Sequence, residues 1–162
     1  FNVLSQEKEK ERVLFNDDVA LINVDTKWRN HPDPLTVPRE QWRGHPSVSN
    51  LYVLAFAHER GITSLRSLRG DRHLPMLRHI YKKGLETIEE VYGVKEDQLR
   101  VCVHYQPQFH HFHVHFTRLS NEWGFQAEHA VLLQTIIHNL EVDPEYYAKA
   151  PLQYRLPVNS PL

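Results

Sequence analysis

The sequence predicts an α+β fold in which an antiparallel sheet packs against helices. Segments with alternating apolar residues indicate strands, and segments with helical spacing indicate helices. The two kinds do not alternate regularly along the chain, which argues against a parallel α/β fold. The 162 residues are 41% hydrophobic and 24% charged, as is typical of one globular domain.

The N-terminal part predicts a β-hairpin followed by a long loop. The runs "ERVLFND" (11–17) and "VALINVD" (19–25) are rich in β-forming residues and meet at Asp17-Asp18. Residues 26–47 then contain four prolines, which exclude helix interiors and central strands. We therefore expect a long surface loop there.

The rest of the chain predicts three helices and three strands. Helical spacing covers Val48–Arg60, a segment from Asp71 as N-cap to about Tyr92, and Ala127–Leu140. Alternating residues in 98–106 and 110–119 predict two strands joined around Gln108–Phe109, and residues 152–158 predict a last strand.

The totals exclude several classes of protein. The net charge is −1 and the pI is about 6.9, so we expect no broad basic surface for long nucleic acid. Cys102 is the only cysteine, which excludes an internal disulfide and fits a reducing compartment. No apolar run approaches the ~18 residues of a membrane span, and no signal-peptide pattern is present. Because the chain begins with Phe1, we expect further segments upstream.

Three histidines stand at every second position of "HFHVHF" (111–116). Side chains alternate across a strand, so His111, His113 and His115 share one face while apolar residues share the other. Metal binding, a solvated face and nucleophilic catalysis are the three interpretations. His111 and His115 lie ~13 Å apart at ~3.3 Å per residue, too far to share one zinc ion easily. Neutral imidazole is a good nucleophile at neutral pH. We favour catalysis without metal or cofactor.

The same residues resemble a known family. "HFHVHF" followed by Thr117 matches the pattern His-φ-His-φ-His-φ-φ of the histidine triad superfamily, which hydrolyses or transfers nucleotides at a phosphate. With "LRVCVHYQPQFHHFHVHFT", "LYVLAFAHERGITSLRSL" and "VDTKW", the chain resembles the C-terminal domain of the scavenger messenger-RNA decapping enzymes. The resemblance runs from about Glu7 to the tail.

The resemblance implies a fold and an activity. It implies a histidine triad (HIT) fold with helices on one face of the sheet, paired as a homodimer. It implies metal-independent hydrolysis of the triphosphate bridge of a 7-methylguanosine cap dinucleotide or short capped RNA, in the cytoplasm and also the nucleus. A phosphoryl-histidine would form, and 7-methylguanosine monophosphate would leave. Residues 1–162 would be the catalytic domain, without the family's swapped N-terminal domain and its cap-stacking tryptophan.

The resemblance also implies residue roles. His113 would be the nucleophile, while His111 and His115 would orient it and contact the phosphates and the leaving oxygen. His104, on the preceding strand, would lie roughly opposite His113. The substrate-binding set would be Lys27, at the phosphates, Asp25 and Glu9, at the methylated guanine, and Gln108, Phe109 and Thr26.

Some positions depart from the family pattern. Gln108 stands in place of a family serine, and Thr26 in place of an apolar residue that sandwiches the base. His129 aligns with a family arginine, and the proline-rich loop 29–47 is longer than the family norm. Tyr52, on the first expected helix, can face either the core or the site.

Three rival functions stay open. A general triad hydrolase would act on dinucleoside polyphosphates or nucleoside phosphoramidates, and would prefer diadenosine triphosphate to a cap. A cap-binding module would bind the cap without releasing monophosphate. A zinc protein would contain metal and lose its function in chelator.

Overall fold

The computed structural model describes residues 11–121, 129–155 and 158, and it confirms the α+β prediction. One antiparallel sheet of six strands has the order β1-β2-β3-β5-β4-β6. The strands are β1 (Val13–Asn16), β2 (Ala20–Val24), β3 (Tyr52–Ala57), β4 (Leu99–His104), β5 (His113–Arg118) and β6 (Ala130–Leu132). The α-helices are α1 (Gly70–Tyr92), α2 (Leu133–Val142) and α3 (Tyr146–Lys149).

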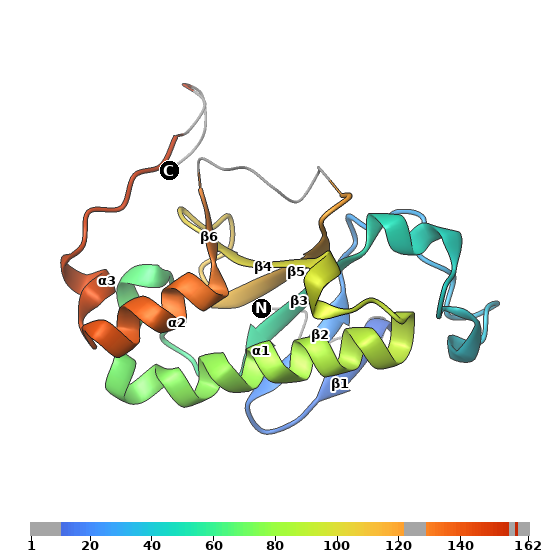
Figure 1. The fold of residues 1–162 in the computed structure, drawn as a ribbon, viewed down its shortest axis with the longest axis horizontal. Coiled ribbons are helices and arrows are strands. Elements are labelled where there is room, and N and C mark those ends of the chain that lie inside the picture. Colours follow the sequence, from blue (N-terminus) through green and yellow to red (C-terminus); the bar gives the residue numbers. More distant parts are fainter. Residues whose placement is uncertain (1–10, 122–128, 156–157, 159–162) are drawn as a thin grey trace.

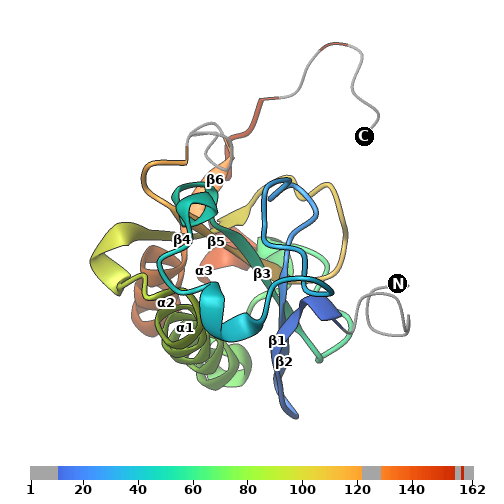
Figure 2. The ribbon, with the colours of Figure 1, turned by 90° about the vertical axis from the view of Figure 1, so that its right-hand side faces the viewer.

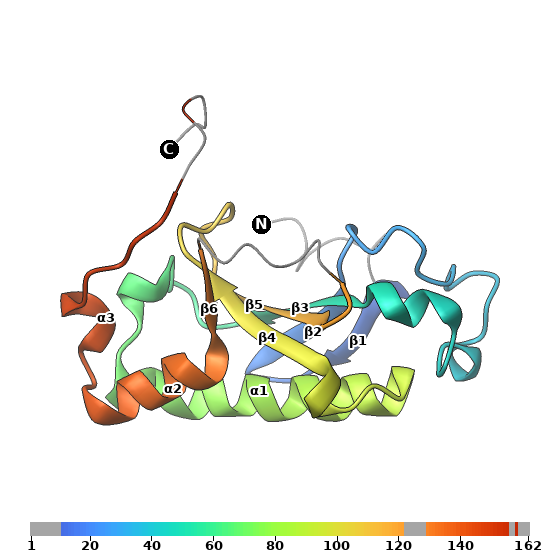
Figure 3. The ribbon, with the colours of Figure 1, turned by 45° about the horizontal axis from the view of Figure 1, so that its top comes forward.

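The two longer helices cover one face of the sheet. Figures 1 and 3 show α1 running along that face with α2 beside it, and Figure 2 shows α1 end-on beneath the strands. Val114 and Phe116 of β5 are fully buried. The Phe116 ring lies so close to α1 that a Cβ on Gly84 would overlap it. The sheet and α1 are therefore in direct contact at Gly84.

The opposite face of the sheet carries the histidines. The register pairs His115 with Leu54 of β3 on one side and with Cys102 of β4 on the other. β5 is thus a central strand, hydrogen-bonded along both edges. Its position holds His113 and His115 on a rigid part of the fold.

The prediction of a helix over Val48–Arg60 is wrong. A 3₁₀ turn over Pro46–Asn50 leads into β3, which pairs with β2 and β5 at the centre of the sheet. Short apolar runs fit both helical and extended spacing, and the tyrosine, valine and phenylalanine of "YVLAFA" favour a strand.

Other boundaries also differ from the predictions. The long helix begins at Gly70 after Arg69 as N-cap, so Asp71 lies in its first turn. It ends at Tyr92, and Gly93 caps it with a left-handed φ of 72°. The third helix starts only at Leu133, because the residues before it form β6 along β4. Residues 151–155 form no strand, and β5 begins two residues after His111.

The proline-rich loop is held against α1 by an aromatic cluster. The His31 ring lies 4.7 Å from Trp28 and 4.6 Å from Trp42, both edge-on, and its Nε2 is 2.8 Å from the Tyr92 hydroxyl. Both tryptophans are only 3% exposed. Residues 26–47 are a loop, as predicted, but a well anchored one.

Candidate active site

A cavity of ≈ 220 Å³ opens on the histidine face of the sheet. It lies where β3, β4 and β5 meet the loops that follow β2 and β4. Its lining consists of Asp25, Lys27, Leu54, Phe56, His104, Gln108, Phe109, His113 and His115. Seven of these nine residues were predicted from the sequence; Leu54 and Phe56 were not.

The His113 ring has a defined tautomer. Its Nδ1 lies 2.7 Å from the carbonyl oxygen of His111. A carbonyl can only accept, so Nδ1 carries the proton and Nε2 of the neutral ring keeps its lone pair. Burial lowers the pKa of His113 below the usual 6.5. The ring is therefore neutral, with a free nitrogen, at physiological pH.

His115 lies deeper and is tied to Tyr52. The Tyr52 hydroxyl is 2.9 Å from His115 Nδ1. Burial raises the pKa of Tyr52 and lowers the pKa of His115, so the pair is a neutral phenol and a neutral imidazole. If the phenol donates to Nδ1, His115 Nε2 carries the proton. That Nε2 is buried without a hydrogen-bond partner among the described residues, and a ligand oxygen would satisfy it.

The site continues as a row of imidazole rings. The His104 ring is stacked on His115, with centroids 3.9 Å apart, and His115 lies 4.8 Å from His113. His129 meets His104 edge-on at 5.1 Å. His104 shares the histidine face, as predicted, and its ring packs on His115. His129, which aligns with a family arginine, packs against His104 at the end of this row.

Asp25 and Lys27 border the cavity from the turn after β2. The Asp25 carboxylate accepts the backbone N–H of Lys27 at 2.6 Å, which fixes the turn. Lys27 Nζ lies 5.6 Å from the centroid of the Tyr52 ring. A positive charge therefore stands beside the His115–Tyr52 pair, at a cavity that is also lined by imidazole rings and the Asp25 carboxylate.

Two predicted residues are placed differently from the prediction. The His111 ring is not part of the cavity lining: it is 4% exposed, and its Nε2 donates to the carbonyl of Ala57. It reaches the site through its own carbonyl, which orients His113. Thr26 is exposed and near Asp25, outside the lining, while Glu9 falls outside the described residues.

The residues that sequence reasoning missed come from β3. Phe56 stacks on His113 with centroids 5.6 Å apart, and Leu54 is paired with His115. Tyr52, which the sequence allows in either the core or the site, lies beside His115. All three stand at alternate positions of "YVLAFA", and that alternation was the available signal.

Neither a metal centre nor a membrane helix is evident in the described part of the chain. Within residues 11–121, 129–155 and 158, no group of three or more histidine, cysteine, aspartate or glutamate side chains is placed to hold a metal ion. In the same residues, no helix has the length and apolar character to span a membrane.

Comparison with known proteins shows the family to which the chain is similar. Residues 1–130 match the family model described as "Scavenger mRNA decapping enzyme C-term binding". Proteins named m7GpppX diphosphatase from Sus scrofa and Homo sapiens are each 38% identical over all of this chain and 45% of their own length. The one from Caenorhabditis elegans is 36% identical over 95% of this chain and 46% of its own length. The chain thus spans about half the length of these relatives.

A solved structure shares the fold. "Hnt3 in complex with DNA and guanosine" superposes with a TM-score of 0.52 at 14% identity, over 90% of this chain and 78% of its own. That likeness supports the HIT-like architecture. Because the family model covers residues 1–130, the chain belongs to the scavenger mRNA decapping enzyme C-terminal family.

Proposed function

We propose that this chain is the catalytic domain of an m7GpppX diphosphatase, which hydrolyses the triphosphate bridge of a 7-methylguanosine cap on a dinucleotide or short RNA. The relatives that carry this name match the whole chain. The observation that carries the proposal is the hydrogen bond from His113 Nδ1 to the His111 carbonyl, because it leaves Nε2 free in a cavity bordered by Lys27.

The reaction has two steps. His113 Nε2 attacks the phosphorus attached to 7-methylguanosine, an N–P bond forms, and the bond from phosphorus to the bridging oxygen breaks. A nucleoside diphosphate, or a short RNA with a 5′-diphosphate, leaves. Water then attacks the same phosphorus, the N–P bond breaks, and 7-methylguanosine monophosphate leaves while a proton passes to solvent. The imidazole returns to its neutral form.

The neighbouring groups support each step. When Nε2 bonds to phosphorus, the His113 ring becomes cationic, and the carbonyl of His111 stabilises it through Nδ1–H. Lys27 neutralises charge on the phosphate oxygens. His115 Nε2 donates to a non-bridging oxygen, and His104 holds the His115 ring by stacking. The leaving diphosphate needs little protonation, because the second pKa of a phosphate is only about 6.

Substrate binding is assigned to the rim of the cavity. Asp25 pairs with the N1–H and amino group of the methylated guanine, and Glu9 assists it. Gln108 donates its side-chain amide to a phosphate oxygen, and Phe109 packs beside the nucleophile, with its ring 6.1 Å from His113. Thr26 stands at the edge of the base site. No metal or other cofactor takes part.

Two further properties are proposed with this activity. The domain forms a homodimer, since a two-fold self-complementary interface is the commonest oligomer. It acts in the cytoplasm and in the nucleus. Light scattering at micromolar concentration tests the first, with a dimer mass expected and a monomer mass against it.

One incubation tests the function and its rivals together. The chain is given equal concentrations of m7GpppG, unmethylated GpppG and diadenosine triphosphate, with EDTA present, and the products are resolved by chromatography. We expect 7-methylguanosine monophosphate and GDP as the fastest products. Faster cleavage of diadenosine triphosphate would indicate a general triad hydrolase, and bound but uncleaved cap a binding module. Either result, or abolition by EDTA, contradicts the proposal.

A further inference from the structure

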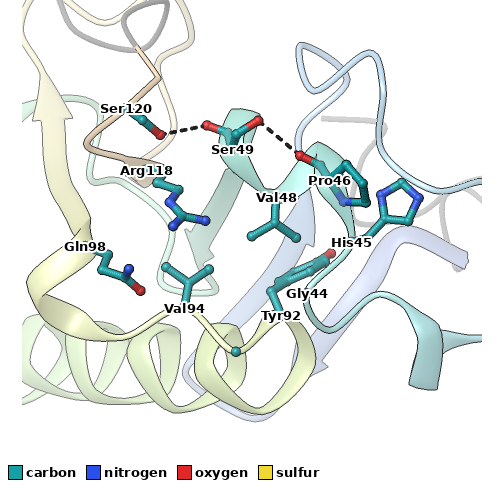
Figure 4. A pocket seen from close by; sticks show the side chains of 11 residues that line it. Gly44, His45, Pro46, Val48, Ser49, Tyr92, Val94, Gln98, Arg118 and Ser120 are labelled. Carbon is teal, nitrogen blue, oxygen red and sulfur yellow. Dashed lines mark hydrogen bonds between the residues drawn. The ribbon is translucent and has the colours of Figure 1, made fainter.

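A second cavity lies at the C-terminal end of α1, away from His104, His113 and His115. It has a volume of ≈ 440 Å³ and is lined by Gly44, His45, Pro46, Val48, Ser49, Tyr92, Gly93, Val94, Gln98, Arg118 and Ser120 (Figure 4). Arg118 ends the strand that His113 begins, about 17 Å away at ~3.3 Å per residue. Their odd spacing puts the two side chains on opposite faces of the sheet. One small ligand cannot occupy both cavities.

The cavity presents unused hydrogen-bond donors. The Arg118 guanidinium has no hydrogen bond or ion pair with another described residue. Gln98 uses its Oε1 to accept the backbone N–H of Lys95 at 3.3 Å, which leaves its amide hydrogens for a ligand. His45 Nδ1 accepts the backbone N–H of Ser47 at 3.2 Å, so Nε2 is the ring nitrogen left to donate to a ligand.

Among the residues that the structure describes, no acidic side chain lines this cavity. The α1 C-terminus would bring a partial negative charge, but three of its last four carbonyls accept hydrogen bonds. Arg43 donates to the carbonyls of Glu89 and Glu90 at 2.8 and 3.2 Å, and the Gly44 N–H donates to that of Tyr92 at 3.3 Å. What these residues offer an incoming ligand is therefore a guanidinium and further hydrogen-bond donors, which favour an anion.

The donors lie at two ends of an apolar floor. Figure 4 shows the Arg118 guanidinium and the Gln98 amide at one end, and His45 at the other. Between them, Val48 and Val94 are 4% and 2% exposed and belong to the core, so the floor is preformed. A ligand that satisfies both ends has an anionic group at one end, an apolar middle and a polar group at the far end.

The sides of the cavity add hydrogen-bond acceptors. The Ser49 hydroxyl donates to the Pro46 carbonyl at 3.1 Å, and the Ser120 hydroxyl donates to the Ser49 carbonyl at 3.0 Å (Figure 4). Both hydroxyl hydrogens are used, so the two oxygens offer lone pairs. They suit a ligand that carries hydroxyl or amino groups of its own.

We propose that this cavity is a second binding site, for a phosphate monoester of a small polar molecule. The planar fork of Arg118 fits two phosphate oxygens, and Gln98 donates to a third. The body of the ester lies over Val48 and Val94 and reaches His45 Nε2–H. The volume lies in the range of small-molecule sites. This site is independent of the proposed catalytic activity.

Calorimetric titration with inorganic phosphate and with adenosine 5′-monophosphate tests the site. The titration uses the full 162-residue chain carrying Lys27→Ala, so that phosphate binding at the catalytic cavity is weakened. We expect one binding event per chain, tighter for the ester than for inorganic phosphate. Adding Gln98→Glu keeps the oxygen that Lys95 needs and places a negative charge in the cavity, so affinity should fall by at least about tenfold.

Matched variants make the result decisive. Gln41→Glu makes the same charge change on an exposed side chain outside the cavity, and it should leave affinity unchanged. Arg118→Gln should abolish binding, while Arg118→Lys keeps the charge, loses the fork and should weaken it. Equal affinity in the Gln98→Glu and Gln41→Glu chains, or no binding to the Lys27→Ala chain at millimolar ligand, overturns the proposal.

Discussion

The Nδ1 atom of His113 lies 2.7 Å from the carbonyl oxygen of His111. This contact joins two members of the triad through the backbone of one and the ring of the other. It fixes the tautomer, and hence which nitrogen keeps the lone pair that the proposed mechanism uses. The ring of His111 turns away to Ala57, so the first histidine of the motif contacts His113 through its main chain.

Replacing the nucleophile should abolish turnover while binding persists. Asparagine at 113 is polar and smaller but cannot form the covalent intermediate, so His113→Asn should lower kcat by at least ~10³-fold. His110→Asn changes an exposed histidine of the same segment and should leave kcat unaltered. Steady-state kinetics and cap binding measure both. A His113→Asn chain that keeps a tenth of the normal rate would place the nucleophile elsewhere.

Removing the Tyr52 hydroxyl should impair catalysis through His115. In Tyr52→Phe, His115 Nδ1 loses its partner and the tautomer with Nε2–H is no longer fixed. We expect kcat to fall by roughly tenfold and the free energy of unfolding to fall by ~1 kcal/mol. Tyr81→Phe is the control, since that hydroxyl bonds Glu96 and Gln134 away from the site. It should cost stability without affecting kcat, and equal effects on kcat would refute the role.

Stability should fall as the pH drops below about 6.5. Burial lowers the pKa of His31 to about 4 and also lowers the pKa values of His113 and His115. Below the unfolded-state pKa of about 6.5, the unfolded chain binds these protons before the folded chain does. Each such histidine then removes up to ~1.4 kcal/mol of stability per pH unit, for His31 until about pH 4.

Denaturant unfolding between pH 7.5 and 4.5 checks that the free energy of unfolding falls as the pH falls. His31→Gln can still bond the Tyr92 hydroxyl and does not titrate, so its stability should decline less steeply with acid than that of the parent chain. Stability that stays constant or increases from pH 6.5 to 4.5 would contradict the burial of neutral imidazoles.

Alanine at position 84 should destabilise the fold although alanine favours helices. The substitution gains ~1 kcal/mol of helix propensity, but its Cβ would overlap the buried Phe116 ring. Overpacking typically costs ~1–3 kcal/mol, so the net change should be a loss. Lys82→Ala, exposed on the same helix, serves as the control. A Gly84→Ala chain more stable than the parent would show that α1 and β5 are not in contact there.

Local pattern predicted part of this molecule well. The period of two in "HFHVHF" and "LRVCVH" placed His104, His113 and His115 on one face, and the hairpin at Asp17 follows from β-forming runs around a turn. In the 23-residue α1, apolar residues recur at helical spacing over many turns. Short runs contain too few residues to show such a period.

Other features depend on contacts between distant residues. Leu51, Leu54 and Ala55 also fit helical spacing, so the local pattern predicts a helix where β3 lies. Only pairing with β2 and β5 decides between helix and strand. The hydrogen bond between Tyr52 and His115 joins residues that lie 63 positions apart in the sequence. The orientation of the His111 ring depends on its hydrogen bond to Ala57. No local signal contains these contacts.

Trapping the covalent intermediate tests the central claim most directly. The chain is mixed with m7GpppG, quenched in alkali, where phosphoramidates survive, and its peptides are analysed by mass spectrometry. We expect a 7-methylguanylate group on Nε2 of His113, formed and lost at rates that account for turnover, and absent from the His113→Asn chain. A modified residue other than His113, or rapid turnover with no modified peptide at any time, would contradict the mechanism.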